Sequence, residues 1–113
     1  MAQKSDYFSV ANDTKWRELR KAILELDCAE WPSFRCKSLD TGHLSSWDGE
    51  WYYHWSEGGW DWMEWAELSV RTPQERDTLR EILRLIRFAG VETADGFRIY
   101  GYIRRGEVAD YIK

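Results

Sequence analysis

His54 and the carboxylates Glu64 and Glu67 are the residues whose types and spacing could carry out acid–base chemistry. His54 lies in a predicted strand, and a carboxylate on the next strand of a hairpin could face it. A histidine beside a carboxylate can act as a general base. The chain has no recognisable nucleophile motif, and the alternative is a strand histidine that hydrogen-bonds to its neighbours. We therefore assign no catalytic residue.

The cysteines and histidines do not match a metal-binding pattern. Seven residues separate Cys28 from Cys36, a spacing that fits neither a zinc motif nor a redox motif. His43 is the other histidine and lies in a predicted loop. Because a zinc site needs three or four ligands in agreement, we expect no metal and no cofactor. The two thiols are expected to stay reduced and to pack as small hydrophobic side chains.

A second candidate site combines tryptophan with acidic residues. Six of the eight tryptophans lie between Trp47 and Trp65, and residues 1–70 carry 7 basic against 13 acidic side chains. Tryptophan is enriched at binding hot spots, and clustered carboxylates speed the capture of a basic protein. The competing interpretation places every tryptophan in the core. The predicted partner-binding residues are Trp47, Asp48, Glu50, Glu57, Trp60 and Asp61.

The charge and the hydropathy exclude several classes of protein. The net charge is −4, whereas a nucleic-acid-binding protein usually presents a net basic face. The arginines at positions 76, 80, 84 and 87 alternate with acidic residues at pairing distances, which favours a salt-bridged helix face over a phosphate site. No apolar run approaches the roughly 18 residues of a membrane span. The start of the chain has no apolar signal region, so we expect a cytoplasmic protein.

Periodicity and turn residues predict two main helices and five strands. The first helix is expected over residues 13–27. The second begins at Thr72-Pro73-Gln74-Glu75 and ends near Ala89, with Gly90 in the left-handed position beyond it. Strands are expected over residues 34–39, 50–55, 62–70, 91–94 and 97–103, and residues 106–112 are compatible with a short terminal helix. Residues 1–11 form either a docking arm or a flexible one.

These elements predict a single α+β domain over residues 1–113, in the order α-β-β-β-α-β-β. Residues 50–55 and 62–70 are expected to pair as a hairpin within a mainly antiparallel sheet of four or five strands. Both main helices are expected to pack on one face of that sheet. Alternation in the third strand places Glu64 toward the core, where it needs a partner. The other sheet face would carry Arg35, Lys37, Tyr52, His54, Tyr100 and Tyr102.

Three segments, residues 47–54, Glu64-Trp65 and residues 98–102, resemble a family of small uncharacterised bacterial proteins over about residues 13–103. In size, acidity and tryptophan content the chain is also similar to bacterial immunity proteins, which are cytoplasmic single-domain inhibitors of toxins. That resemblance implies a protein-binding module that neutralises a toxin domain. The alternative is an enzyme or small-ligand-binding protein that uses the polar aromatic sheet face around His54.

Overall fold

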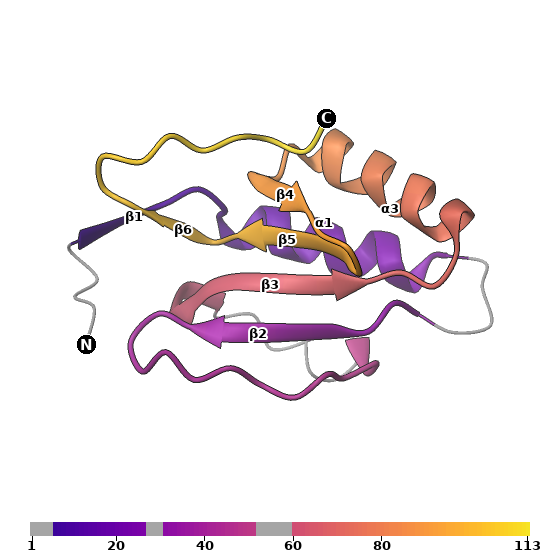
Figure 1. Ribbon diagram of the computed structural model, residues 1–113, viewed down its shortest axis with the longest axis horizontal. Coiled ribbons are helices and arrows are strands. Elements are labelled where there is room, and N and C mark those ends of the chain that lie inside the picture. Colours follow the sequence, from indigo (N-terminus) through magenta and orange to yellow (C-terminus); the bar gives the residue numbers. More distant parts are fainter. Residues whose placement is uncertain (1–5, 27–30, 52–59) are drawn as a thin grey trace.

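The computed structural model describes residues 6–26, 31–51 and 60–113, which form an α+β fold with mainly antiparallel pairing (Figure 1). Within these residues a four-stranded sheet has the order β2-β3-β5-β4, and a two-stranded sheet joins β1 to β6. The strands are β1 (Tyr7–Ser9), β2 (Phe34–Ser38), β3 (Met63–Ser69), β4 (Gly90–Glu92), β5 (Gly96–Tyr100) and β6 (Tyr102–Arg104). The helices are α1 (Asp13–Leu24), α3 (Pro73–Ile86) and the short 3-10 helix η2 (Trp60–Trp62).

Local signals set where both main helices begin. The Asn12 side chain accepts a hydrogen bond from the Lys15 backbone N–H at 3.0 Å, which caps α1. Thr72 caps α3 in the same way by accepting from the Glu75 N–H at 3.1 Å. The left-handed residue beyond α3 is Arg87, with φ of 68°, and not Gly90 as expected. No described helix is long and apolar enough to cross a membrane.

The helices and the inner face of the four-stranded sheet share one hydrophobic core. In Figure 1, α1 lies behind the sheet, and α1 and α3 contact each other. Trp16 of α1 packs its ring 4.9 Å from that of Phe88. The core joins buried residues of both helices to those of β2, β3 and β5, namely Trp16, Leu19, Ile23, Leu79, Leu83, Phe34, Cys36, Ala66, Leu68, Phe97 and Ile99. The opposite face of the sheet carries no described helix.

The partners of β3 differ from the expected hairpin. Both edges of β3 are paired, one with β2 and the other with β5, so it has no free edge for residues 50–55. Of that expected strand, residues 52–55 lie outside the described part of the chain, and Glu50 and Trp51 are in no strand. Trp51 instead packs in the core against Phe34, at 4.8 Å between rings, and its indole N–H donates to the Pro32 carbonyl at 2.7 Å.

A β-bulge in β3 corrects the expected orientation of Glu64. Lys37 is paired with Trp65 and the next residue of β2, Ser38, with Met63, which leaves Glu64 as the extra residue. A bulge shifts the alternation of side chains beyond it. Met63 therefore enters the core, whereas Glu64 lies beside Lys37 instead of among core residues.

The strands and segments near both ends of the chain pair with distant parts of the structure. The expected final strand is divided at Gly101 into β5 and β6. Only glycine fits at this position, because a Cβ there would lie 2.3 Å from the Met63 carbonyl oxygen. Within the described residues, β1 pairs with β6. The expected helix over residues 106–112 is wrong. This segment runs back from β6 past β4 (Figure 1), and buried Ile112 donates its backbone N–H to Phe88 O at 3.0 Å.

Candidate functional site

A buried carboxylate joins three strands on the free face of the sheet. Glu67 of β3 is 7% exposed and is paired in register with Arg35 of β2 and Arg98 of β5. Arg35 Nη2 lies 2.6 Å from Glu67 Oε1, and Arg98 Nη2 lies 3.0 Å from Glu67 Oε2. Each oxygen therefore binds its own guanidinium group. The alternation of residues predicted this face for Arg35, but only the strand order reveals the three-residue network.

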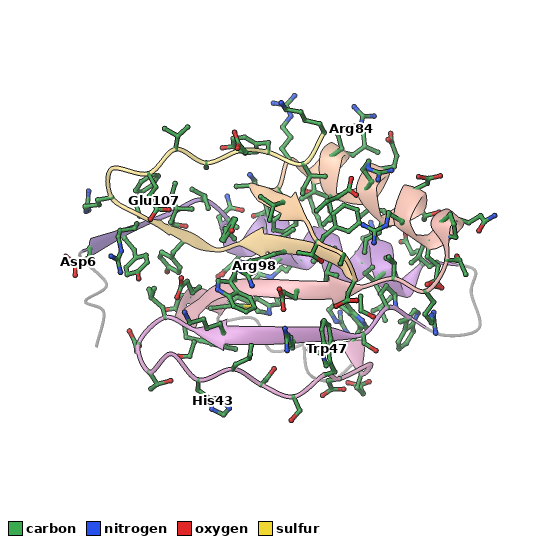
Figure 2. The ribbon with its side chains drawn as sticks, viewed as in Figure 1. Asp6, His43, Trp47, Arg84, Arg98 and Glu107 are labelled. Carbon is green, nitrogen blue, oxygen red and sulfur yellow. The ribbon has the colours of Figure 1, made fainter. Side chains whose placement is uncertain are left out.

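Two indoles extend this network at both ends. The Arg35 guanidinium lies 4.7 Å from the ring centroid of Trp47, and that of Arg98 lies 4.1 Å from that of Trp65. Such contacts add cation–π attraction and hold the planar groups in place. Figure 2 shows Arg98 over the β3–β5 part of the sheet and Trp47 on the β2 side. The stack presents Trp47 in a fixed position at the edge of the sheet.

An apolar depression, here the tryptophan groove, lies between the segment after β2 and the residues before β3. Its volume is about 320 Å³. Residues 44–48 are fixed along β2, because Phe34 and Asp48 exchange backbone hydrogen bonds of 2.7 and 2.8 Å. Trp47 is 43% exposed and Trp62 is 44% exposed. The groove is lined by Phe34, Cys36, Ser45, Ser46, Trp47, Asp48, Trp60, Trp62 and Met63.

The predicted partner-binding residues are only partly brought together. Trp47 and Asp48 line the groove, and the Glu50 backbone N–H donates to Asp48 Oδ1 at 2.8 Å. Asp61 is exposed in η2, one residue from Trp62. Trp60 is only 5% exposed and so corrects the expectation of a surface anchor there. Glu57 lies outside the described residues.

The thiol in the tryptophan groove is not activated. Burial raises the pKa of the Cys36 thiol to about 12, and the negative charge of Asp48 acts in the same direction. A thiol is nucleophilic as its thiolate, so Cys36 is inert near neutral pH. The expectation that Cys36 packs as a small hydrophobic residue is confirmed by its place in the core. Cys28 lies outside the described residues.

A second depression, here the strap cavity, lies at the other end of the strands, near β6 and the C-terminal segment. Its volume is about 340 Å³. Lys37 Nζ and Glu64 Oε1 are 3.5 Å apart in its wall, and Tyr100 and Tyr102 contribute aromatic rings. Of the predicted polar face, Arg35, Lys37, Tyr100 and Tyr102 are thus located. Tyr52 and His54 lie outside the described residues, and the acid–base hypothesis around His54 therefore stays a prediction from the sequence.

The arginine stripe of α3 forms a salt-bridged face, as the charge pattern predicted. Arg80 binds Asp77 at 2.8 Å and Glu92 at 2.7 Å, and Arg84 also pairs with Glu81. Arg76 binds Glu92 at 3.1 Å and donates to the carbonyl of Ala94 at 2.9 Å. The contacts of Arg76 and Arg80 with Glu92 and Ala94 fix α3 to β4 and the turn after it, whereas the Arg84–Glu81 pair lies within α3.

The comparisons with known proteins identify a family but no activity. Among the described residues no group of three or more histidine, cysteine, aspartate or glutamate side chains could hold a metal ion. None of the curated proteins and none of the solved structures matches the chain. The model of DUF6678, a family of unknown function, matches residues 1–106, and the chain therefore belongs to that family.

Proposed function

We propose that this protein binds a basic partner protein through the tryptophan groove and its acidic rim. The observation that carries the proposal is the exposure of Trp47 and Trp62, 43% and 44%, beside one apolar depression. Large aromatic side chains held rigidly at the surface make strong anchors, because little side-chain entropy is lost on binding. Trp47 is held by its stack on Arg35, and Trp62 is the last residue of η2.

The charge around the groove argues for a basic partner. Asp48 lines the groove, Asp61 adjoins Trp62 in sequence, and Glu50 is bound through its backbone to Asp48. The whole chain carries a net charge of −4. Carboxylates at the rim of an interface attract a positively charged surface and speed its approach, while the apolar centre supplies most of the affinity.

We further propose that the partner is a bacterial toxin domain and that the chain acts in the cytoplasm as its immunity protein. The resemblance in size, acidity and tryptophan content supports this choice. An inhibitor of this kind works by covering the basic active-site face of a toxin, so it needs no catalytic residue of its own. The location of the gene directly downstream of a toxin gene would support this identification.

The test begins with affinity capture from the native host and identification of the retained protein. The dissociation constant of the purified pair is then measured for the wild type, for Trp62→Ala and for Leu85→Ala. Leu85 is a suitable control because it is 67% exposed on α3 and does not line the groove. Loss of a central anchor costs about 2 kcal/mol or more, which is roughly a thirtyfold loss of affinity.

Asp61→Lys separates electrostatic attraction from anchoring. The reversal of a rim charge should slow association and weaken its dependence on salt, with little change in the dissociation rate. The binding proposal fails if no protein is retained. If a protein is retained but the host grows equally well beside toxin producers without this gene, the immunity role fails while the binding function remains.

A further inference from the structure

The strap cavity has the size and the mixed chemistry of a small-ligand site. Its volume of about 340 Å³ falls within the range of known ligand pockets. Rings of Tyr7, Tyr100 and Tyr102 line it from three strands, and residues 107–110 of the C-terminal segment form another side. None of its lining residues belongs to the tryptophan groove, so a ligand here is independent of the proposed protein partner.

The bulge in β3 gives this cavity a carboxylate that the regular alternation would have directed to the core. Bulges often re-aim side chains beside functional sites. The Glu64 side chain is 17% exposed and the Lys37 side chain 35% exposed. Their 3.5 Å separation exceeds the roughly 2.7–2.9 Å of a strong charged hydrogen bond. In the described part of the chain neither group has another hydrogen-bonding or ionic partner, so both keep capacity for a ligand.

The charges around the cavity favour a ligand that carries both signs. Two cations, Lys37 and Arg104, and three carboxylates, Glu64, Glu107 and Asp110, line it. Arg104 lies 5.7 Å from the ring centroid of Tyr7, and Lys37 is the cation that pairs with Glu64. A ligand with only a negative charge would be repelled by the excess of carboxylates. A ligand with only a positive charge would be repelled by the Lys37 ammonium. A zwitterion satisfies both members of the pair.

We propose that the strap cavity binds a small zwitterion of the amino-acid type. The Glu64 carboxylate accepts hydrogen bonds from the ligand ammonium, and the Lys37 ammonium donates to the ligand carboxylate. The rings of Tyr100 and Tyr102 pack against the ligand side chain. The C-terminal segment, which forms one side of the cavity, is held against β4, since the Gly90 N–H donates to the Asp110 carbonyl at 2.8 Å and Ile112 is buried in the core.

Three ligands that differ by one group each test the requirement for both charges. L-norleucine is the zwitterion, pentylamine lacks its carboxylate, and hexanoate lacks its ammonium. Each is titrated into the full-length protein while the backbone amide NMR signals of Glu64 and Tyr100 are followed. Norleucine should give saturable shifts. Each single-charge compound should bind about tenfold more weakly or worse, because a charged hydrogen bond is lost.

Variants then assign the two roles. Glu64→Gln and Lys37→Met should each weaken norleucine binding about tenfold or more, whereas Glu81→Gln should leave it unchanged. Glu81 is a suitable control because it is an exposed carboxylate of α3 that does not line the cavity. Thermal unfolding checks that each variant folds. Equal affinity for the three compounds in the wild type, no saturable shift with norleucine, or undiminished binding by both folded variants would overturn the proposal.

Discussion

Neutralisation of Glu67 by the substitution Glu67→Gln should destabilise the protein strongly. The side chain keeps its size, but two guanidinium groups lose the charge that each contacts at 2.6–3.0 Å. Removing one member of a buried ion pair costs about 3–5 kcal/mol, whereas exposed pairs contribute about 0–1 kcal/mol. The Glu67 side chain is 10% exposed, and those of Arg35 and Arg98 are 32% and 36% exposed. Partial rehydration of both arginines therefore places the loss at about 2–3 kcal/mol.

Urea unfolding followed by tryptophan fluorescence measures this loss. The midpoint should fall while the slope stays unchanged, because the folded state loses interactions and not compactness. The matched control is Glu92→Gln. Glu92 also contacts two arginines, Arg76 at 3.1 Å and Arg80 at 2.7 Å, but its side chain is 46% exposed. The control should lose a small fraction of what Glu67→Gln loses. Equal losses in the two variants would refute the argument that burial makes the Glu67 network important.

Three further predictions concern single positions. Arg87→Gly should be more stable to heat than Arg87→Ala by about 1 kcal/mol, because Arg87 has φ of 68° and a Cβ is disfavoured there. Gly96→Ala should lower the free energy of unfolding, measured with urea, by about 1–3 kcal/mol, because its Cβ would lie 1.9 Å from the Leu68 carbonyl oxygen. In a Cys28→Ser background, Cys36 should react with Ellman's reagent at pH 8 only after unfolding, and rapid reaction of the native protein would contradict its burial. Since burial raises its pKa from 9.0 to about 12, its contribution to stability should be present below pH 9 and be lost as the pH rises from there toward 12, measured against Cys36→Ala.

Local patterns were sufficient to predict α3 and the faces of the last strands. The capping side chain of Thr72 acts within one turn, so the start of α3 needs no tertiary information. Tyr100 and Tyr102, which alternation assigned to the outer face, are partly exposed, and the residues that alternate with them, Ile99 and Ile103, are buried. Strand partners could not be predicted in this way. Alternation shows that Met63–Ser69 is a strand, but residues 50–55 had a similar pattern and lie nearer in sequence than β5 does.

The candidate site was predicted at the level of the segment but not of the individual residue. Trp60 and Trp62 lie in the same turn of η2, yet the first is buried and the second exposed. Composition does not distinguish them, because packing of η2 against α1 decides which indole faces inward. The sequence pattern does not predict the bulge at Glu64 either, since the bulge depends on the register between β2 and β3.

The orientation of the C-terminal segment also depends on distant contacts. Tyr111 and Ile112 could have continued a short helix after Gly106. Instead, Tyr111 forms a bridge with Ala89, and the backbone N–H of Ile112 binds the Phe88 carbonyl. These contacts satisfy backbone groups at the end of α3 and beside β4. Ile112 gains a place in the core that a surface helix would not have given it.

The dissociation constant of the identified partner for Trp62→Ala, measured beside Leu85→Ala and the wild type, tests the central claim most directly. The claim is that the tryptophan groove is the binding surface. It predicts a loss of affinity of about thirtyfold or more for Trp62→Ala and none for Leu85→Ala, with all three proteins equally folded. Equal dissociation constants for the three proteins would contradict it.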